Sequence, residues 1–573
     1  MLADPRGGLA PSHETVTEDT SLQRLDEAKQ KAFRELTDVL PAYLVQGPPG
    51  VGKTYLVREV VRRRFNEEAT ARLLLTAQSH HTVDHLMREI SKDWSDGGPL
   101  AVRCRPNIES ENTGPLDLNA CTRTILNDFA ESEIARSISR RLGDRLTALL
   151  GPSGKGGPGK GETRLVEGLV MRAANIVFAT TNSADLERLL EERGQFDWAI
   201  IEEADKATGS ELLIPLLLSY RRLMIGDHKQ LPPFGSDKLA ALLNDPDKLR
   251  PALRQGLPLL TMGLRDAIPE DLMETLEADD GDLFARLCSE ARRVLFLFES
   301  MVETEIDRQD RGGRGKPIAR KLNIQHRMHP NIGDLVSRCF YSGGLDTSKN
   351  ARQHFATTSS PVLTLDPTLV PDAPIVVVDL PYERSLNGSQ YAERYPRFSN
   401  PQEVRAVCKV IANLRGEPTE GVAPSLAVLS PYERQVARLK AAFDDDPAVG
   451  AALSTFQPVG RRAAWCSTVD AFQGNEADAV VVSLVRNNHR ASPRPALGFV
   501  SDPRRMNVLL SRAKWRLYIV TSLEFLRTVT LPLGRGEQND TDFLGKLLST
   551  LDEYFETGKA VRLDGVTLLG DGV

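Results

Sequence analysis

The eight residues GPPGVGKT, from Gly47 to Thr54, constrain the fold of this chain more than any other stretch. A glycine, four free positions and then Gly-Lys-Thr form the pattern of a phosphate-binding loop. Tyr43–Val45 is a short apolar run that predicts a buried strand before the loop, and Tyr55–Phe65 has the spacing of a helix after it. In that order the glycines let the backbone wrap a phosphate, and the helix directs its free N–H groups at it. We therefore predict a nucleotide site in which Lys53 neutralises phosphate charge and Thr54 holds magnesium. The residues of the predicted loop are Gly47, Pro48, Pro49, Gly50, Val51, Gly52, Lys53 and Thr54.

A second glycine-rich tract, Gly151–Thr163, has part of the same pattern. Gly154 is followed by four residues and then by Gly159 and Lys160, but the next residue is Gly161 instead of Ser or Thr. No apolar run precedes the tract. This composition favours a flexible surface segment over a second nucleotide site.

Length and composition indicate a globular protein of several domains. The 573 residues are enough for three or four domain-sized units, and 41% hydrophobic with 26% charged residues is ordinary for a soluble protein. Because the net charge is −6, any nucleic-acid surface must be a local basic groove. Basic clusters of that kind occur at 62–65 and at 486–516, where eight Arg or Lys residues accompany one Asp.

Cysteine spacing and hydropathy bear on metal binding and location. The six cysteines are scattered without a C-x-x-C pair, which argues against a zinc site or a disulfide framework. The N-terminal MLADPRGG lacks the architecture of a signal peptide, and no apolar run reaches the roughly 18 residues needed to span a bilayer. We expect no membrane association and a cytoplasmic protein, or a nuclear one if the source is eukaryotic.

Strand-like and helical segments alternate along two regions of the chain. In the first, an amphipathic helix is predicted over 21–40, and further strands over 71–78, 174–181, 197–203 and 221–227. In the second, strands are predicted over 374–380, 425–431, 478–485 and 516–522. Such alternation predicts the α/β class, with parallel sheets covered by helices on both faces. The second region has no phosphate loop of its own, which suggests one site in the cleft between two domains.

The segments between these patterns set the expected domain limits. We expect a flexible N-terminus over 1–20, a first domain over 21–236 with an insertion at about 96–172, and a charged helical insertion over 237–293. A second domain is expected over 294–530 and a C-terminal tail over 531–573.

A phosphate loop alone leaves kinases, GTPases and motor proteins open, and later motifs narrow the choice. Glu202-Glu203-Ala204-Asp205 follows a predicted buried strand, which suits one carboxylate for magnesium and one to activate the attacking water. GDHKQLPP at 226–233 follows the next strand and places an amide and charges near a γ-phosphate. QHRMHP at 325–330, TVDAFQGNEAD at 468–478 and DPRRMNVLLSRAKWRLYIV at 502–520 come after these.

In this order and spacing the motifs resemble those of superfamily 1 helicases. The likeness is greatest to the branch of the nonsense-mediated-decay RNA helicase, senataxin and the immunoglobulin-μ-binding helicases. It covers most of the chain from Leu25 to about Leu526, without the insertions. The resemblance implies two RecA-like domains, ATP hydrolysis with Mg²⁺, and translocation on single-stranded DNA or RNA, usually from 5′ to 3′.

The resemblance also implies roles for single residues. For the nucleotide, Gln30 would read the adenine edge, His326 and Gly474 would line the base and sugar, and Glu476 would bind ribose. For hydrolysis, Glu202 would hold magnesium with Thr54, Glu203 would be the general base, Gln230 would sense the γ-phosphate, and Arg327 and Arg512 would be arginine fingers. A planar guanidinium suits this last role because it matches phosphate in a bidentate way. Contacts to the strand would come from Ser79, Thr82, Thr180, Thr181, Ser430, Pro431, Tyr432 and Thr468; for each hydroxyl the alternative is a helix cap or a turn.

Three features depart from the family pattern. Position 202 usually carries Asp, and a Glu is one methylene longer, which can misplace a magnesium ligand by about 1 Å. His326 stands where an aromatic Tyr is common and offers less stacking area. Only 46 residues precede Gly47, too few for the β-barrel that many relatives carry there. Either the two insertions take over strand gripping or control by other subunits, or the chain is one piece of a longer protein or complex.

Two hypotheses follow from the sequence. The first is an ATP-dependent helicase or translocase on single-stranded nucleic acid. The second is a nucleotide-gated scaffold subunit with weak or no ATPase activity, which Glu202 and the net acidity motivate. A phosphate-loop kinase or GTPase is disfavoured because it leaves the whole second domain without a role.

Overall fold

The structure is a computed structural model, and it divides into two compact units. Unit 1 comprises residues 1–46, 53–228 and 232–321, and unit 2 comprises 47–52, 229–231 and 322–573. The structure describes residues 20–38, 41–92, 94, 98–105, 114–150, 160–259, 275–276, 281–382, 390–396, 398–459, 464–530 and 538–570. Residues 1–19 of the predicted flexible N-terminus and the first part of the glycine-rich tract, 151–159, lie outside these ranges.

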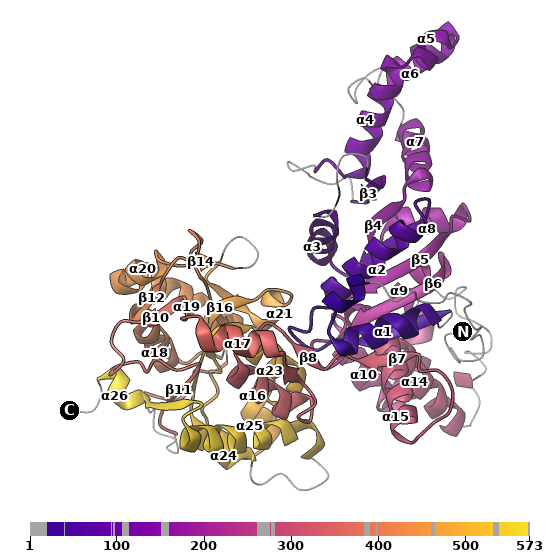
Figure 1. The fold of residues 1–573 in the computed structure, drawn as a ribbon. Helices are drawn as coiled ribbons and strands as arrows, with labels where there is room; N and C mark the ends of the chain where they lie inside the picture. The colour runs from indigo at the N-terminus through magenta and orange to yellow at the C-terminus, as the bar shows by residue number, and fades with distance from the viewer. Residues whose placement is uncertain are drawn as a thin grey trace. The chain divides into compact units, whose positions relative to one another are not determined.

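Unit 1 is built on a seven-stranded sheet in which every neighbouring pair of strands is parallel (Figure 1). The strand order is β3-β4-β2-β5-β6-β1-β7. β1 and β2 are buried along their whole length, as expected of strands covered on both faces. The strands are β1 (Ala42–Gln46), β2 (Leu73–Ala77), β3 (Ala101–Arg103), β4 (Ile176–Thr180), β5 (Phe196–Glu202), β6 (Ser219–Gly226) and β7 (Ala319–Lys321).

The helices next to this sheet form for local reasons. In α3 (His80–Ser91), Ser79 caps the N-terminus, and Val83, Leu86 and Ile90 recur on one face and are buried. α1 (Glu27–Asp38) precedes the first strand, and the helices that connect strands are α2 (Lys53–Glu67), α3, α8 (Ala184–Glu191) and α9 (Gly209–Leu217), with 3₁₀ turns at Thr20–Arg24 and Ala204–Lys206.

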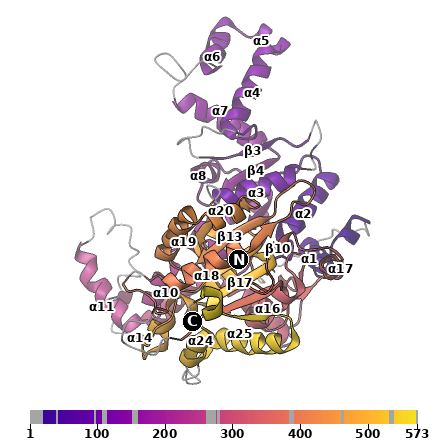
Figure 2. The same ribbon diagram turned by 90° about the vertical axis from the view of Figure 1, so that its left-hand side faces the viewer.

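The two predicted insertions of unit 1 are mainly helical. The first forms an arm that extends away from the sheet (Figure 2), and α14 (Gly281–Leu295) of the second packs against α9. The first insertion also supplies β3, a strand that the sequence pattern did not predict. The arm comprises α4 (Leu118–Glu131), α5 (Glu133–Ser137), α6 (Arg140–Leu150) and α7 (Lys160–Ala173), and the second insertion comprises α10 (Ser236–Leu243), α11 (Pro246–Gly256) and α14 (Gly281–Leu295).

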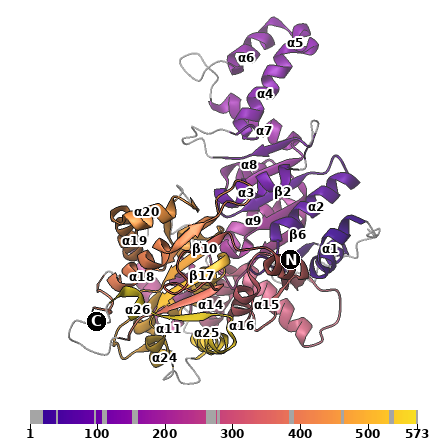
Figure 3. The same ribbon diagram turned by 60° about the vertical axis from the view of Figure 1, so that its left-hand side comes forward.

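Unit 2 is a second parallel α/β unit (Figure 3). Its sheet has the order β14-β13-β16-β17-β11-β18, and β15 also pairs with β13. Buried Val376, Val428 and Val481, from three of these strands, lie in its hydrophobic core. The strands are β11 (Ile375–Asp379), β13 (Ser425–Ser430), β14 (Gln457–Pro458), β15 (Cys466–Thr468), β16 (Ala477–Ser483), β17 (Ala513–Thr521) and β18 (Val561–Asp564).

Helices and two small sheets complete unit 2. β8 (Ile324–Gln325) pairs with β9 (Asp346–Thr347), and β10 (Val362–Thr364) pairs with β12 (Leu414–Gly416). The helices are α16 (Pro330–Phe340), α17 (Lys349–Thr357), α18 (Pro401–Ala412), α19 (Glu433–Asp445), α20 (Pro447–Leu453), α21 (Val469–Phe472), α22 (Pro493–Leu497), α23 (Pro503–Leu510), α24 (Leu523–Thr530), α25 (Gln538–Thr557) and α26 (Gly565–Leu569).

The predicted fold class is confirmed, since both units are parallel α/β sheets with flanking helices. The domain limits differ from those expected from the sequence. α15 (Leu297–Asp310) and β7 belong to unit 1, which therefore runs to Lys321, whereas the first domain was expected to end at 236 and the second to begin at 294. The segment expected to be a C-terminal tail supplies α25 and β18, and β18 pairs with β11 inside the sheet of unit 2.

A buried carboxylate supports a strained turn in unit 2. Val485 follows β16 with φ of 74°, a left-handed conformation that is unfavourable for a β-branched residue. Glu403 on α18 accepts hydrogen bonds from Val485 N at 2.8 and 2.9 Å and from Ser483 Oγ at 2.5 Å. Burial raises the pKa of Glu403 to about 8, so this carboxyl is a source of pH-dependent stability.

We expect Glu403→Gln to reduce the pH dependence of stability above pH 6. A carboxyl whose pKa rises from 4.5 in the unfolded chain to about 8 in the folded protein makes the folded state lose stability as pH rises through that interval. Between pH 6 and pH 8.5 the loss from this group is about 2 kcal/mol, and the amide removes it. Urea unfolding at both pH values measures the difference. Glu417→Gln, at an exposed position, should keep the wild-type pH dependence, and equal pH dependence in all three proteins would contradict the prediction.

Candidate nucleotide site and strand contacts

The predicted phosphate loop lies between β1 and α2, as the sequence indicates. β1 ends at Gln46 and α2 begins at Lys53. Gly50 and Gly52 have φ of 75° and 76°, which glycine adopts without the strain that a side chain would bring. The first N–H groups of a helix have no partner within the helix, which is why a phosphate-binding loop leads into a helix N-terminus.

Thr54 and Glu202 meet directly, although 148 positions separate them in the sequence. Thr54 Oγ1 donates to Glu202 Oε1 at 2.6 Å. Glu202 Oε2 is buried and accepts no hydrogen bond from the residues that the structure describes. Burial raises the pKa of Glu202 to about 7, and the hydrogen bond from Thr54 partly opposes this shift. A hydroxyl and a partnerless carboxylate oxygen are hard donors that fit Mg²⁺, so the longer Glu side chain is compatible with the predicted metal site.

Glu203 is held in one orientation by two contacts. It has a left-handed backbone with φ of 53°; Lys206 Nζ lies 2.5 Å from its Oε1, and Thr82 Oγ1 donates to its Oε2 at 2.6 Å. Burial alone would raise the pKa of Glu203, but Lys206 and the hydrogen bond from Thr82 lower it below the usual value. The carboxylate is therefore ionised at neutral pH, the form that a general base requires.

Ser79 and Thr82, two of the predicted contacts to a nucleic-acid strand, are hydrogen-bonded in a row that ends at Glu203, the predicted general base. Ser79 Oγ lies 2.8 Å from Thr82 Oγ1, and Ser79 Oγ also accepts from Thr82 N at 3.2 Å as the cap of α3. The hydroxyls of Ser79 and Thr82 thus form a continuous path to Glu203. The sequence did not indicate this path.

Asp205 and Lys206 were not among the predicted site residues, although Asp205 lies in the predicted carboxylate motif and Lys206 directly follows it. Asp205 Oδ1 accepts from Asp227 N at 2.9 Å and so links the ends of β5 and β6. Burial raises the pKa of Asp205 to about 6, and the charge of Lys206 opposes the shift. A side chain at Gly226 would collide with Asp205, which explains the glycine at this position.

Several predicted nucleotide residues lie in unit 2. Arg512 is buried, and its Nη2 donates to Gln230 Oε1 at 2.7 Å. Arg327 Nε lies 2.7 Å from Glu476 Oε2, and Lys514 Nζ lies 2.9 Å from Glu476 Oε1. Burial would raise the pKa of Glu476, but these two cations lower it. Because the carboxylate already holds two cations, ribose binding by Glu476 remains a prediction.

The remaining predicted nucleotide residues have these positions. Gln30 Nε2 donates to Leu25 O at 2.8 Å, so its amide is anchored within the N-terminal segment. His326 N donates to Gly50 O at 2.9 Å, and Gly474 follows α21 with φ of 87°. None of these contacts tests adenine recognition, which stays a prediction.

The predicted strand contacts differ in exposure. Ser430 is fully buried and Tyr432 nearly so, and the Tyr432 hydroxyl accepts from Phe499 N at 3.2 Å. Thr180 and Thr181 are buried at the end of β4, and Thr468 caps α21 by accepting from Ala471 N at 3.4 Å. The helix-cap alternative therefore applies to Ser79 and Thr468, while contact with a strand remains a prediction for the whole set.

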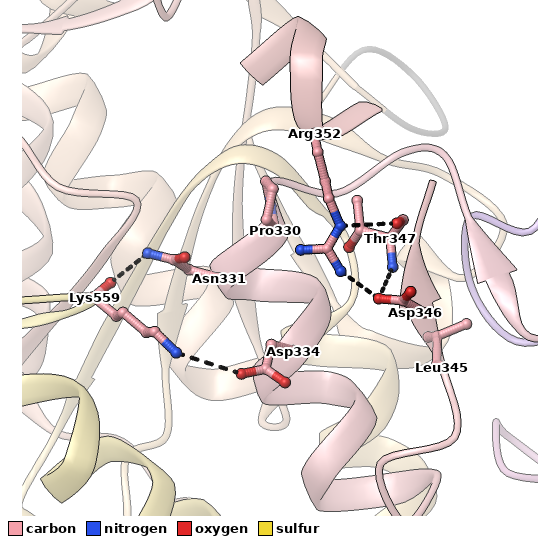
Figure 4. A pocket seen from close by; sticks show the side chains of 8 residues that line it. All are labelled: Pro330, Asn331, Asp334, Leu345, Asp346, Thr347, Arg352 and Lys559. Atoms are coloured by element: carbon pink, nitrogen blue, oxygen red, sulfur yellow. Dashed lines mark hydrogen bonds and ion pairs between the residues drawn. The ribbon is translucent and has the colours of Figure 1, made fainter. Parts of the chain in front are cut away.

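A separate polar pocket lies in unit 2 (Figure 4). It has a volume of about 260 Å³ and none of the predicted site residues lines it. Its lining carries charges of both signs, with Arg352 paired to Asp346 and Lys559 Nζ 3.9 Å from Asp334 Oδ2. These pairs leave no net charge to attract a nucleotide.

The structure adds two observations on thiols and membranes. All six cysteines are buried and free, and the described residues contain no group of three or more His, Cys, Asp or Glu side chains placed to hold a metal ion. No helix in the described ranges is both long and apolar enough to cross a bilayer.

A phosphate loop between β1 and α2, together with two parallel α/β units, defines a class of RecA-like nucleotide-binding proteins, and the comparisons with known proteins agree. Family models described as AAA domains match residues 24–152 with 160–236, and residues 297–524. The regulator of nonsense transcripts 1 homologue of Neurospora crassa is 25% identical over 89% of this chain. The Arabidopsis thaliana homologue is 28% identical over 84%, and the DNA polymerase alpha-associated DNA helicase A of Saccharomyces cerevisiae is 23% identical over 84%. The chain belongs to the superfamily 1 helicases, in the branch of the nonsense-mediated-decay RNA helicase. It spans 39%, 31% and 63% of the lengths of these three relatives.

Proposed function

We propose that this chain is a nucleic-acid-dependent ATP hydrolase that translocates on single-stranded DNA or RNA, in the 5′ to 3′ direction. The observation that carries the proposal is the path from Ser79 and Thr82 to Glu203. A strand that binds the hydroxyls of Ser79 and Thr82 would compete for the hydrogen bond to Glu203. The freed carboxylate could then accept a proton from the attacking water, which makes hydrolysis depend on the strand.

The residues of the nucleotide site divide the remaining work. The phosphate loop and Lys53 would bind the phosphates of ATP, and Thr54 with Glu202 would hold Mg²⁺ through their oxygens. The metal would supply charge neutralisation on the β- and γ-phosphate oxygens. Arg327 and Arg512 would stabilise the charge that develops on the transferred phosphoryl group. Gln230 would sense whether the γ-phosphate is bound.

ATP turnover with and without a single strand tests this function. We expect single-stranded DNA or RNA to stimulate hydrolysis by purified wild-type protein, and a fluorescent duplex with a 5′ single-stranded tail to be unwound faster than one with a 3′ tail. Matched DNA and RNA sequences at a fixed salt concentration compare the two substrates, because phosphate contacts make affinity depend on salt. Turnover that no single strand alters would contradict the proposal.

A second function is a nucleotide-gated binding subunit, in which ATP controls docking to nucleic acid or to other proteins through the insertions. The buried position of Glu202 favours it, because burial disfavours the charged form that a metal ligand needs. In that case ATP should bind and change the affinity for a strand without being hydrolysed. Equilibrium binding with ATP and with a non-hydrolysable analogue separates the two functions.

A further inference from the structure

A row of aromatic rings runs through unit 2 beside the predicted strand-contact segment Ser430–Tyr432. The ring centroids of Tyr395 and Phe398 are 5.9 Å apart, those of Phe398 and Tyr432 are 5.3 Å apart, and those of Tyr432 and Phe499 are 5.2 Å apart. Tyr432 in the middle is buried, whereas Tyr395 and Phe499 at the two ends are 71% and 43% exposed. The row therefore has a solvent-exposed aromatic ring at each end and a buried ring near its centre.

Arginine side chains lie over these rings. The Arg490 guanidinium is 5.2 Å from the Tyr395 centroid, and that of Arg505 is 4.7 Å from the Phe499 centroid. Such contacts hold cations next to aromatic rings at a protein surface. Beneath them, buried Arg486 pairs with buried Glu393 at 2.9 Å, so this inner charge is neutralised and acts as support.

Three more arginines gather next to the exposed end of the row. Arg434 and Arg438 are one turn apart on the same side of α19, and Arg394 directly precedes Tyr395. The pKa of Arg438 is lowered by burial and then by the charges of Arg394 and Arg434, so the three cations lie close enough to repel one another. Arg438 Nε is buried and makes no hydrogen bond to any described residue.

Nearby carboxylates do not neutralise this cluster. Glu393 is committed to Arg486, and it also accepts hydrogen bonds from Asn487 N and Asn488 Nδ2. Glu433, the first residue of α19, is exposed and, within the described ranges, forms no ion pair with Arg394, Arg434 or Arg438. Positive charges held close together repel one another, which costs free energy in the isolated protein. A bound anion would reduce this repulsion.

We propose that these side chains form a binding surface for single-stranded nucleic acid, which we call the arginine–aromatic surface. Arg394, Arg434 and Arg438 would bind phosphates, and the exposed rings of Tyr395 and Phe499 would stack on bases. The proposal rests on the proposed nucleic-acid-dependent function and assigns it new residues. Aromatic rings interleaved with cations suit a nucleic-acid strand better than an acidic peptide, because every base offers a face to stack and every nucleotide a phosphate.

The surface also gives a role to two buried residues of the predicted strand-contact segment. Tyr432 is a member of the aromatic row, and its hydroxyl accepts from Arg486 Nη1 at 3.3 Å and from Phe499 N at 3.2 Å. Ser430 Oγ accepts from Tyr432 N at 3.4 Å. Both residues thus position the rings that would contact the strand.

The test compares two double variants with the same change in charge. Arg434→Ala/Arg438→Ala removes two arginines of the surface, and Lys409→Ala/Arg415→Ala removes two exposed cations elsewhere in unit 2. Binding of a fluorescent 20-nucleotide oligothymidylate is measured over a range of salt concentrations. For two lost phosphate contacts, the slope of log affinity against log salt should fall by about 1.4 in the first variant and stay unchanged in the second.

A third variant separates stacking from charge. Tyr395→Ala should weaken binding of the oligothymidylate about fivefold or more, and should leave binding of an abasic strand of equal length unchanged. If Arg434→Ala/Arg438→Ala keeps the wild-type affinity and salt slope, the surface does not bind the strand. If labelled poly-glutamate loses affinity for this variant while oligothymidylate does not, the surface binds an acidic protein instead. Strand-stimulated ATP turnover of the wild-type protein, which tests the proposed function separately, is unaffected by either result.

Discussion

Replacing Glu203 by Gln should lower strand-stimulated ATP turnover by about 10²- to 10⁴-fold, the range for loss of a general base. Glutamine has the size and the hydrogen-bonding shape of glutamate, but it cannot accept a proton from water at neutral pH. Binding of a fluorescent ATP analogue should change little, because Glu203 is not among the residues expected to hold the phosphates. Steady-state turnover at saturating ATP and strand, together with equilibrium nucleotide binding, measures both effects.

Two further variants make the Glu203 result specific. Lys53→Ala removes the expected phosphate contact and should lose nucleotide binding as well as turnover. Glu191→Gln, the same substitution at an exposed position at the end of α8, should keep the wild-type turnover. If Glu203→Gln hydrolyses ATP within a factor of three of the wild type, another group is the base and the assignment fails.

Long buried strands were predictable because each carries enough apolar residues to identify it without tertiary information. The pattern at 174–181 corresponds to β4 at Ile176–Thr180, and that at 197–203 corresponds to β5 at Phe196–Glu202. Both strands are almost completely buried, so their composition alone distinguishes them from the surface. The order of the strands within the sheets had no comparable signal.

Short strands at the edges of the sheets were not predictable, because they carry too few apolar residues to be identified from the sequence. β3 is three residues long and ends in Arg103, a buried arginine whose Nε donates to Asp84 Oδ1 at 2.8 Å. β18 alternates between half-buried and exposed positions and contains Arg562 and Asp564. A strand of this length depends on pairing with β4 or β11 instead of on its own residues. The expected domain limits at 293 and 531 differ from those of the structure. They relied on composition, which cannot detect such pairing between strands.

The sequence indicated candidate site residues one by one, and the contacts between them appear only in the structure. The sequence indicated Thr54, Glu202, Glu203 and Thr82 separately, whereas the structure joins Thr54 to Glu202 and Thr82 to Glu203. These contacts depend on the parallel order of β1, β2, β5 and β6, which brings the carboxyl ends of distant strands to one edge. The burial of Ser430 and Tyr432 likewise depends on packing against segments far away in the sequence.

Replacing Arg512 by Ala should lower ATP turnover by about 10³-fold or more, the range for loss of an arginine finger. The structure keeps the Arg512 side chain buried, with Nη2 bonded to Gln230 and Nη1 donating to Asn475 O at 3.4 Å. The side chain is thus oriented before any nucleotide binds, which lowers the entropy lost when it contacts the transferred phosphoryl group. Because the charge it would stabilise develops during the reaction, kcat should fall much more than ATP affinity.

Arg512→Lys distinguishes a bidentate contact from a simple positive charge. Lysine keeps the charge but cannot reproduce the planar pair of donors, so we expect it to recover little of the lost kcat. Arg527→Lys, at a half-exposed position paired with Asp552, is the matched control and should behave like the wild type. Turnover near wild type in Arg512→Lys would show that charge alone suffices, and turnover near wild type in Arg512→Ala would remove Arg512 from the catalytic group. A loss of ATP affinity as large as the loss of kcat would instead indicate that Arg512 binds the ground state, because uniform binding affects both states equally.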